Sequence, residues 1–292
     1  MTALHNKHVL VTGGASGIGR LIALGCAKVG ASVTVWDLDA EGAGRAALEA
    51  SEAGAASAHA FVCDVSDREQ VYARAGETRA AAGDVDVLVN NAGIVSGRPL
   101  LDLPDESIER TFAVNTLALF WTTKAFLPAM RARGSGHVVT VASAAGLIGT
   151  ARETDYAASK FAAVGFNEAL RQELRRSARG VRTTVVCPYY IDTGMFAGVK
   201  SRFPLLLPVL KEQEVADRVL EAVRRNTPQV QMPWMVTTLP LLRMLPVWAF
   251  DELADFFGLN NAMDAFTGRA ASDDRGVTKE RARLAGRVGA GS

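Results

Sequence analysis

The sequence has almost no excess charge and few of the residues that build metal or disulfide sites. Lysine and arginine number 32 and aspartate and glutamate 31, so the formal net charge is +1. This balance offers no basic surface for nucleic acid. The three cysteines and four histidines follow no metal-ligand spacing; they are Cys26, Cys63, Cys187, His5, His8, His59 and His137. We interpret the cysteines as small core residues and the histidines as structural or exposed, and expect no metal site.

Long uninterrupted apolar runs are also missing. No window reaches the ~18 apolar residues of a membrane-spanning helix, and the N-terminal stretch MTALHNKHVLVTGG lacks the apolar core of a signal peptide. The nearest approach, residues 234–250, is interrupted by Pro240, Arg243 and Pro246. It could lie on a membrane surface or cover a substrate. We therefore expect a soluble, cytoplasmic protein.

Apolar β-branched runs alternate with longer amphipathic segments. The runs predict strands at 8–12, 32–36, 58–62, 85–90, 137–143 and 182–188, and the segments between them predict helices such as 17–29, 67–82, 105–131 and 154–178. Continuous apolar strands in this alternation indicate an α/β fold with a parallel sheet covered on both faces.

No repeat or linker divides the chain, so we expect a single domain over residues 1–270 with a helical C-terminal extension. Two segments, 189–211 and 234–267, are rich in large apolar residues and are predicted to cover a substrate. Residues 271–292 have almost no large apolar residues and are predicted to form a mobile tail.

The first predicted strand leads directly into TGGASGIG, residues 12–19. Gly13, Gly17 and Gly19 allow a tight turn, in which backbone N–H groups can approach a pyrophosphate at a helix N-terminus. A glycine-rich turn need not bind anything, but its position after the first strand favours a dinucleotide site.

Carboxylates and amides follow the next three predicted strands. Asp37 can accept hydrogen bonds from the adenosine ribose of NAD and would repel the 2′-phosphate of NADP, so we favour NAD. Asp64 could meet an adenine amino group or simply begin a helix. In NNAG, residues 90–93, Asn90 can tie neighbouring strands and Gly93 permits close approach of the cofactor.

The segment DYAASK places Tyr156 and Lys160 on one helical face, because residues four apart in a helix are neighbours. The lysine ammonium is expected to lower the phenol pKa from ~10 and to bind the nicotinamide ribose. Tyr156 would then exchange a proton with an alcohol as hydride moves. Ser143, at the end of the fifth strand, can stabilise the developing alkoxide. Asn115 either packs helices or holds a water behind Lys160.

These motifs, in this order and spacing, resemble the short-chain dehydrogenase/reductase family over roughly residues 5–235. The resemblance implies a Rossmann-type doubly wound sheet, a catalytic set of Asn115, Ser143, Tyr156 and Lys160, and a homodimer or homotetramer built through helices 105–131 and 154–178. The predicted cofactor site comprises Gly13, Ser16, Gly17, Ile18, Gly19, Asp37, Asp64, Val65, Asn91, Ala92, Gly93, Tyr156, Lys160, Pro188, Ile191 and Thr193.

After the sixth strand the chain reads CPYYIDTGMF, with Tyr189 where the family commonly has glycine. This string and LPVWAFDELADFFGLNNAMDAFTGR resemble the branch of epidermal-type retinol dehydrogenases and lipid-droplet 17β-hydroxysteroid dehydrogenases, and the composition suggests a bacterial member. Segments 94–98, 144–149 and 189–210 are predicted to wall an apolar pocket that includes Ala145, Leu147, Tyr189, Tyr190, Met195, Phe196 and Phe203. Alternatively, residues 203–210 merely cover the sheet.

We therefore predict an NAD-dependent dehydrogenase of hydrophobic primary or secondary alcohols of retinoid, steroid, terpenoid or aryl type. A ketone or aldehyde reductase and a non-catalytic NAD-binding module are the alternatives. A further interpretation makes residues 234–257 an interfacial membrane anchor.

Overall fold

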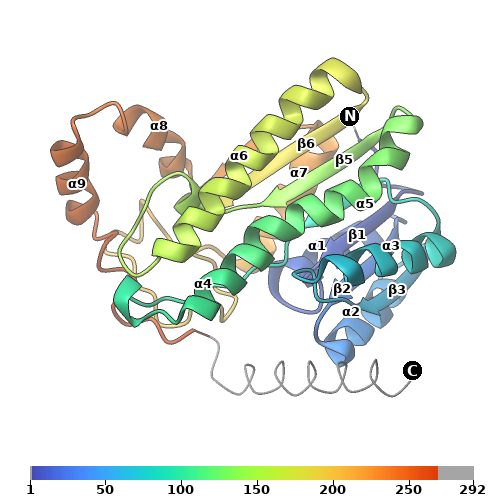
Figure 1. Ribbon diagram of the computed structural model, residues 1–292, viewed down its shortest axis with the longest axis horizontal. Coiled ribbons are helices and arrows are strands. Elements are labelled where there is room, and N and C mark those ends of the chain that lie inside the picture. Colours follow the sequence, from blue (N-terminus) through green and yellow to red (C-terminus); the bar gives the residue numbers. More distant parts are fainter. Residues whose placement is uncertain (1, 269–292) are drawn as a thin grey trace.

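The computed structural model describes residues 2–268 (Figure 1). Its centre is a seven-stranded parallel sheet in the order β3-β2-β1-β4-β5-β6-β7. The strands are β1 (His8–Thr12), β2 (Ser32–Asp37), β3 (Ser57–Val62), β4 (Val87–Asn90), β5 (Gly136–Val141), β6 (Val181–Pro188) and β7 (Gln229–Met232). The order reverses between β1 and β4, which is where doubly wound sheets bind ligands.

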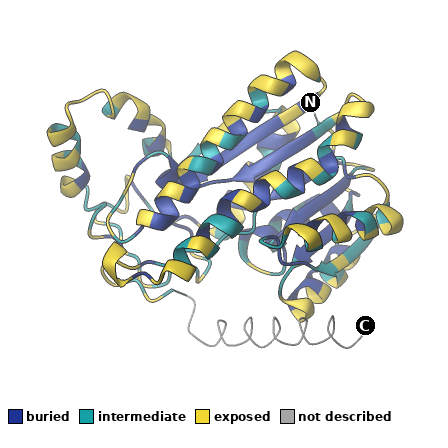
Figure 2. Cartoon of the chain, viewed as in Figure 1, coloured by how far each residue is buried: buried dark blue, intermediate teal, exposed yellow. Residues whose placement is uncertain are grey.

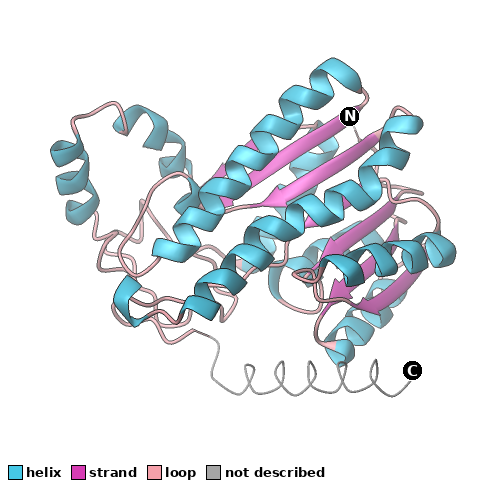
Figure 3. Cartoon of the chain, viewed as in Figure 1, coloured by secondary structure: helices cyan, strands magenta, loops and turns pink. Residues whose placement is uncertain are grey.

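Helices cover both faces of the sheet, so the central strands are buried (Figures 2 and 3). One apolar layer comes from α1 (Gly17–Ala27), α2 (Ala40–Glu52) and α7 (Glu212–Arg225), which pack on the same side. The other comes from α3 (Arg68–Ala82), α5 (Ala118–Ala132) and α6 (Thr154–Ser177). The predicted Rossmann-type architecture is confirmed.

The six predicted strands are present with bounds shifted by at most two residues, and β7 adds a seventh. The predicted helix 105–131 is divided into α4 (Asp105–Phe112), a π-helical turn (Ala113–Leu117) and α5. The predicted role of Asn90 is wrong in one respect. Its side chain bonds Thr122 and Thr123 of α5, at 2.7 and 3.5 Å, and so ties β4 to a helix rather than to a neighbouring strand.

The C-terminal extension forms a helical lobe beside the sheet. It contains a 3₁₀ turn (Trp234–Thr238), α8 (Leu239–Leu242) and α9 (Val247–Phe256), which project from the body in Figure 1. Within residues 2–268, no helix has the length and apolarity to cross a membrane. The tail predicted at 271–292 lies outside the described residues.

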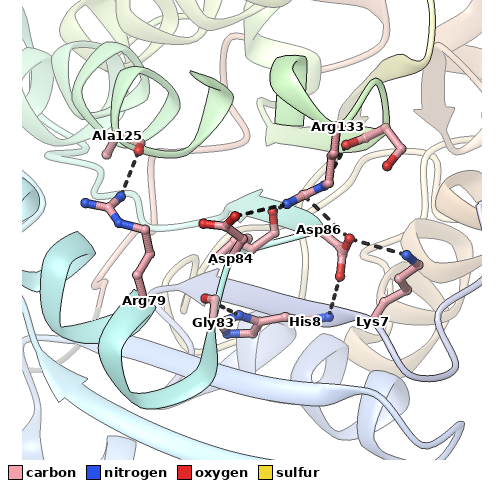
Figure 4. Close-up of polar contacts among 10 residues, drawn as sticks. Lys7, His8, Arg79, Gly83, Asp84, Asp86, Ala125 and Arg133 are labelled. Carbon is pink, nitrogen blue, oxygen red and sulfur yellow. Dashed lines mark hydrogen bonds and ion pairs between the residues drawn. The ribbon is translucent and has the colours of Figure 1, made fainter. Parts of the chain in front are cut away.

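A polar network covers the end of the sheet at which β1, β4 and β5 begin (Figure 4). Asp86 accepts hydrogen bonds from the backbone N–H of His8 at 3.0 Å and from Lys7 at 3.4 Å, and pairs with Arg133 at 3.5 Å. The His8 ring bonds Gly83 at 3.1 Å and Thr34 at 2.8 Å. This edge is thus fixed by structural contacts, and His8 takes a structural role.

Candidate active site

The turn after β1 is held against the end of β4. The Thr12 hydroxyl accepts from the N–H groups of Asn91 and Ala92 at 3.0 and 3.1 Å, and the Asn91 amide donates to Thr12 O and Gly13 O, both at 3.0 Å. A Cβ on Gly19 would lie 2.2 Å from Gly13 O, and Gly13 itself has a φ of 63°. Glycine is therefore required at both positions.

The first turn of α1 presents a surface suited to an anion. It follows Ser16, contains Gly17, Ile18 and Gly19, and carries no acidic residue. The space above Gly17 is bounded by Thr193, whose side chain would lie 3.5 Å from a Cβ placed there. A substituent at Gly17 would also be strained by its φ of 54°.

Asp37 ends β2 with its carboxylate oriented by backbone N–H groups. Its two oxygens accept from Ala15 at 2.9 Å and from Asp39 at 3.1 Å. Burial raises the pKa of Asp37, and the hydrogen bonds from Ala15 and Asp39 act in the opposite direction. Arg20, the first basic residue after the glycine turn, is paired with Glu49 of α2 at 2.5 Å.

Asp64 and Val65 follow β3 and are both buried. The Asp64 carboxylate accepts from the backbone N–H and hydroxyl of Ser66 at 3.0 and 2.6 Å. Asp64 therefore shapes the turn before α3, and its contact with an adenine amino group stays a prediction.

Ser143, Tyr156 and Lys160 meet beyond the ends of β5 and β6. Lys160 donates to Val141 O at 3.0 Å, and its ammonium nitrogen lies 5.6 Å from the centre of the Tyr156 ring. The Ser143 hydroxyl faces Pro188 O at 3.5 Å and forms a hydrogen bond that favours ionisation of Tyr156. All three side chains are buried.

The electrostatics differ from the expectation that Lys160 lowers the pKa of Tyr156. Burial raises the pKa of the phenol, and the hydrogen bond with Ser143 is the contribution that lowers it. Burial also lowers the pKa of Lys160 to about 8. Both effects have one cause, because removal from water penalises the charged form of each group.

Asn115 lies in the π-helical turn, a feature found often at functional sites. Its side chain pairs with the backbone N–H and C=O of Ile94, both at 2.9 Å, and donates to the Ser159 hydroxyl at 3.0 Å. A Cβ on Gly93 would lie 3.3 Å from Asn115 Oδ1 and 3.4 Å from Lys160 Nζ. The glycine therefore lets the two side chains approach the same point of the backbone. The bonds to Ile94 and Ser159 support the packing role of Asn115, and a water behind Lys160 stays a prediction.

The N-terminal turn of α6 is anchored by Asp155. The hydroxyls of Ser96 and Thr111 donate to its two oxygens at 2.7 and 2.9 Å. These bonds join the loop after β4 and helix α4 to the turn that carries Tyr156. Asp155 was not among the predicted residues, because an acidic residue near a helix start is common for helix stability alone.

An apolar pocket opens beside Ser143. The lining residues come from the turns after β5 and β6 and from the C-terminal lobe; they are Ser143, Ala144, Ala145, Ile148, Thr150, Glu153, Tyr189, Tyr190, Leu207, Met235, Val236, Thr238, Leu239, Leu242, Phe250, Leu253, Ala254, Phe257 and Leu259.

Three of the seven predicted pocket residues are found in the lining. They are Ala145, Tyr189 and Tyr190. Phe196 stacks on Tyr156 and Tyr190, with ring centres 5.9 and 5.1 Å apart.

The remaining three lie elsewhere. Leu147 lines a separate surface hollow with Phe161 and Arg243. Phe203 packs on Phe256 and Phe257 and so braces α9, and Met195 is half-buried outside the lining. Much of the observed lining comes from residues 234–259. The apolar composition of this stretch predicted that it covers a substrate, but it did not identify which of its residues line the pocket.

Glu153 is the unexpected member of this pocket. Its side chain is buried, and burial raises the pKa of its carboxyl from 4.5 to about 7. One oxygen accepts hydrogen bonds from Thr150 and from the Tyr190 hydroxyl. Within the described range, no group of three or more potential metal ligands surrounds this carboxyl or any other. The three cysteines are buried and unpaired, as predicted.

The raised pKa predicts how stability depends on pH. The folded chain binds the Glu153 proton more tightly than the unfolded chain, so the stabilisation present below pH 4.5 is lost as the pH rises through about 7. We expect Glu153→Gln to gain stability relative to wild type over this range, by up to about 3 kcal/mol. Denaturant unfolding at a series of pH values measures the difference, with exposed Glu173→Gln as the control. A difference that stays constant with pH would contradict the assignment.

Comparisons with known proteins agree with this geometry. The family model for short chain dehydrogenase matches residues 7–202. The chain is 43% identical to epidermal retinol dehydrogenase 2 of Mus musculus over 89% of its length and 85% of the relative's. It is 40% identical to retinol dehydrogenase 10-B of Danio rerio, covering 88% of this chain and 83% of that one.

A solved short chain dehydrogenase/reductase from Burkholderia phymatum, in complex with NAD, superposes with a TM-score of 0.75 at 27% identity. It covers 84% of this chain and 95% of its own. The family match extends over the glycine turn, the end of β4, the π-helical turn and the Ser143–Tyr156–Lys160 centre. This chain therefore belongs to the short-chain dehydrogenase/reductase family.

Proposed function

We propose that this protein is an NAD-dependent oxidoreductase that interconverts a hydrophobic primary or secondary alcohol and its carbonyl compound. The observation that carries the proposal is the meeting of Ser143, Tyr156 and Lys160 beside an apolar pocket that Ser143 lines. A proton-transfer group beside an apolar cavity is what an alcohol substrate requires.

The residues near the carboxyl ends of β1, β2 and β4 fit a dinucleotide. The first turn of α1 offers N–H groups to a pyrophosphate, and Gly17 leaves space for it, while Gly13 and Gly19 let the turn pack closely. Asp37 offers carboxylate oxygens to ribose hydroxyls, while Arg20 is occupied by Glu49. This favours NAD over NADP. Ile191 and Thr193, after β6, would flank the nicotinamide. When bound, the nicotinamide supplies the site that accepts or donates the hydride.

The chain's own groups handle the proton. Tyr156 would give its phenolic proton to a carbonyl oxygen, or take one from an alcohol, while Ser143 donates a hydrogen bond to the same oxygen. Lys160, held by Val141 O, supplies positive charge beside the phenolate that forms. Asn115 would support a water between Lys160 and solvent, through which the proton is replaced.

The lining of the pocket favours a bulky apolar substrate. Branched and aromatic side chains dominate it, and few of its residues carry a polar side chain. The relatives are named as retinol dehydrogenases, which agrees with a lipophilic alcohol of retinoid, steroid, terpenoid or aryl type.

Reduction is the second candidate direction. Burial raises the pKa of Tyr156 and so favours the protonated phenol, which is the form that delivers a proton to a carbonyl. The same centre would then act as a ketone or aldehyde reductase.

We also infer a homodimer or homotetramer built through α5 and α6, which lie side by side in Figure 1. Leu117, Phe120 and Phe161 leave apolar area exposed on and beside these helices. Burial of that area against a second copy would stabilise the assembly.

The catalytic assignment predicts the effect of Tyr156→Phe. The substitution removes the proton donor, so kcat for NAD-linked oxidation of apolar alcohols should fall by about 10²–10⁴-fold while NAD still binds. Tyr72→Phe, at an exposed tyrosine of α3, is the matched control. Assays against alcohols of rising apolar size measure both variants. Unchanged turnover in Tyr156→Phe would reject the assignment.

The cofactor assignment predicts the effect of Asp37→Ser. Loss of the carboxylate should lower kcat/KM with NAD by about 10–100-fold and narrow the preference over NADP, because both ribose hydrogen bonds and 2′-phosphate repulsion disappear. Asp84→Asn, at the opposite edge of the sheet, is the control (Figure 4). An NAD-to-NADP ratio that stays the same in Asp37→Ser would refute the role.

The exposed face of the lobe predicts interfacial membrane contact. Leu241, Met244, Val247 and Trp248 are 69–80% exposed and gather on α8, on α9 and between them. We expect wild type to sediment with liposomes and its serine variant at these four positions to bind at least about tenfold more weakly. Leu101→Ser, at a residue that is 97% exposed outside the lobe, is the control. Wild type that stays wholly in the supernatant would end this proposal.

A further inference from the structure

The Glu153 side chain lies inside the apolar pocket, not on the surface where a glutamate at a helix start normally lies. It immediately precedes α6, three residues before Tyr156, and is 1% exposed. Its backbone C=O accepts from Ala157 N–H at 2.6 Å, which fixes the residue to the first turn of the helix. The backbone is thus anchored while the carboxyl reaches the pocket that begins at Ser143.

The two carboxyl oxygens have different surroundings. Oε2 accepts from the Thr150 hydroxyl and, at 3.3 Å, from the Tyr190 hydroxyl. Oε1 is buried, and no donor among residues 2–268 reaches it. A buried polar atom without a partner is costly, so the fold retains at Glu153 a group that the core itself does not need.

Nothing in the lobe compensates for this oxygen. Leu239, Phe250 and Leu253 line the pocket from that side and offer no side-chain donor, and the hydroxyl of Thr238 donates to Met235 O at 2.7 Å instead. Aromatic contacts connect the carboxyl to the reacting centre, because Tyr190 packs on Phe196 and Phe196 packs on Tyr156. A ligand that extends from Ser143 along this wall would therefore reach Glu153.

We propose that Glu153 is a specificity-determining residue whose Oε1 binds a second hydroxyl group on the substrate, remote from the carbon that is oxidised or reduced. The natural substrate would then be an apolar molecule with two oxygen functions, not a hydrocarbon that carries a single alcohol. This inference rests on the proposed function, since it deepens the substrate class of the same site.

A hydroxyl group suits this position better than other polar groups. Burial leaves the carboxyl able to exist in either form near neutrality. The ionised form can only accept a hydrogen bond, whereas the neutral form can also donate one. A hydroxyl group both donates and accepts, so it can pair with Oε1 in either form. An ether oxygen only accepts and cannot pair with the carboxylate.

The test compares matched ligands at a pH above 7, where the carboxylate predominates. The probes are 1-alkanols, the terminal diols of the same chain lengths, and the diols with one end capped as a methyl ether. We expect wild type to favour the diol over the alkanol by about 10–100-fold in kcat/KM at one preferred length, and to reject the ether.

Two variants and a control assign this preference to Glu153. Glu153→Leu should bring the diol-to-alkanol ratio to about one while turnover of the alkanol continues. Glu153→Gln, which is nearly isosteric and should fold, presents an N–H donor and should shift the preference towards the ether. Glu173→Leu, at an exposed position of α6, should behave as wild type. A ratio near one in wild type at every length, or an unchanged ratio in both Glu153 variants, would overturn the proposal.

Calorimetric binding of the same ligands in the presence of NAD separates the two proposals. Diol binding that depends on Glu153 without any turnover would reject the oxidoreductase assignment and keep the binding site. Turnover of alkanols and diols with no dependence on Glu153 would do the reverse. Absence of any difference in binding between diol and alkanol in wild type would also overturn the role of Glu153.

Discussion

The contact between the turn after β1 and the end of β4 is the constraint on which the rest of the site depends. Thr12 and Asn91 exchange hydrogen bonds across it, and the gap is too narrow for any side chain at Gly19. Because the strand order reverses between these two strands, this contact fixes the two halves of the sheet relative to each other. The ends of β2, β5 and β6 then lie at the same edge, where their polar side chains can act together.

Burial is the second constraint, and it divides the polar groups of the site into two kinds. Asn115 and Asp155 form hydrogen bonds with other segments, so they fix α4, the π-helical turn and the loop after β4 against α6. For Tyr156, Lys160 and Glu153, burial shifts the pKa in the direction that favours the neutral form of the side chain. Groups of the first kind hold the site in place, and those of the second kind are the ones that a ligand can affect.

The parts that the sequence predicts well are those determined by neighbours along the chain. The glycine turn, the Tyr156–Lys160 spacing and the apolar strands are local patterns, and the structure contains them with small shifts in their bounds. The strand β7 was missed because QVQM is short and half polar, and the π-helical turn at Asn115 has no local signal. The position of Glu153 depends on Tyr190 and Thr150 and on a lobe about a hundred residues away, so no local pattern could predict its burial.

The helical lobe has a double role that follows from its size. Helices of four and ten residues cannot form a core of their own, so α8 and α9 place Leu239, Phe250 and Ala254 against the turn after β5 and thereby close the pocket. Their other faces keep large apolar side chains exposed. The wall of the pocket that α8 and α9 form is therefore the one that the sheet supports least. Changes in the lobe can alter which molecules enter, while the Thr12–Asn91 contact and the buried network around Asn115 keep the reacting groups in position.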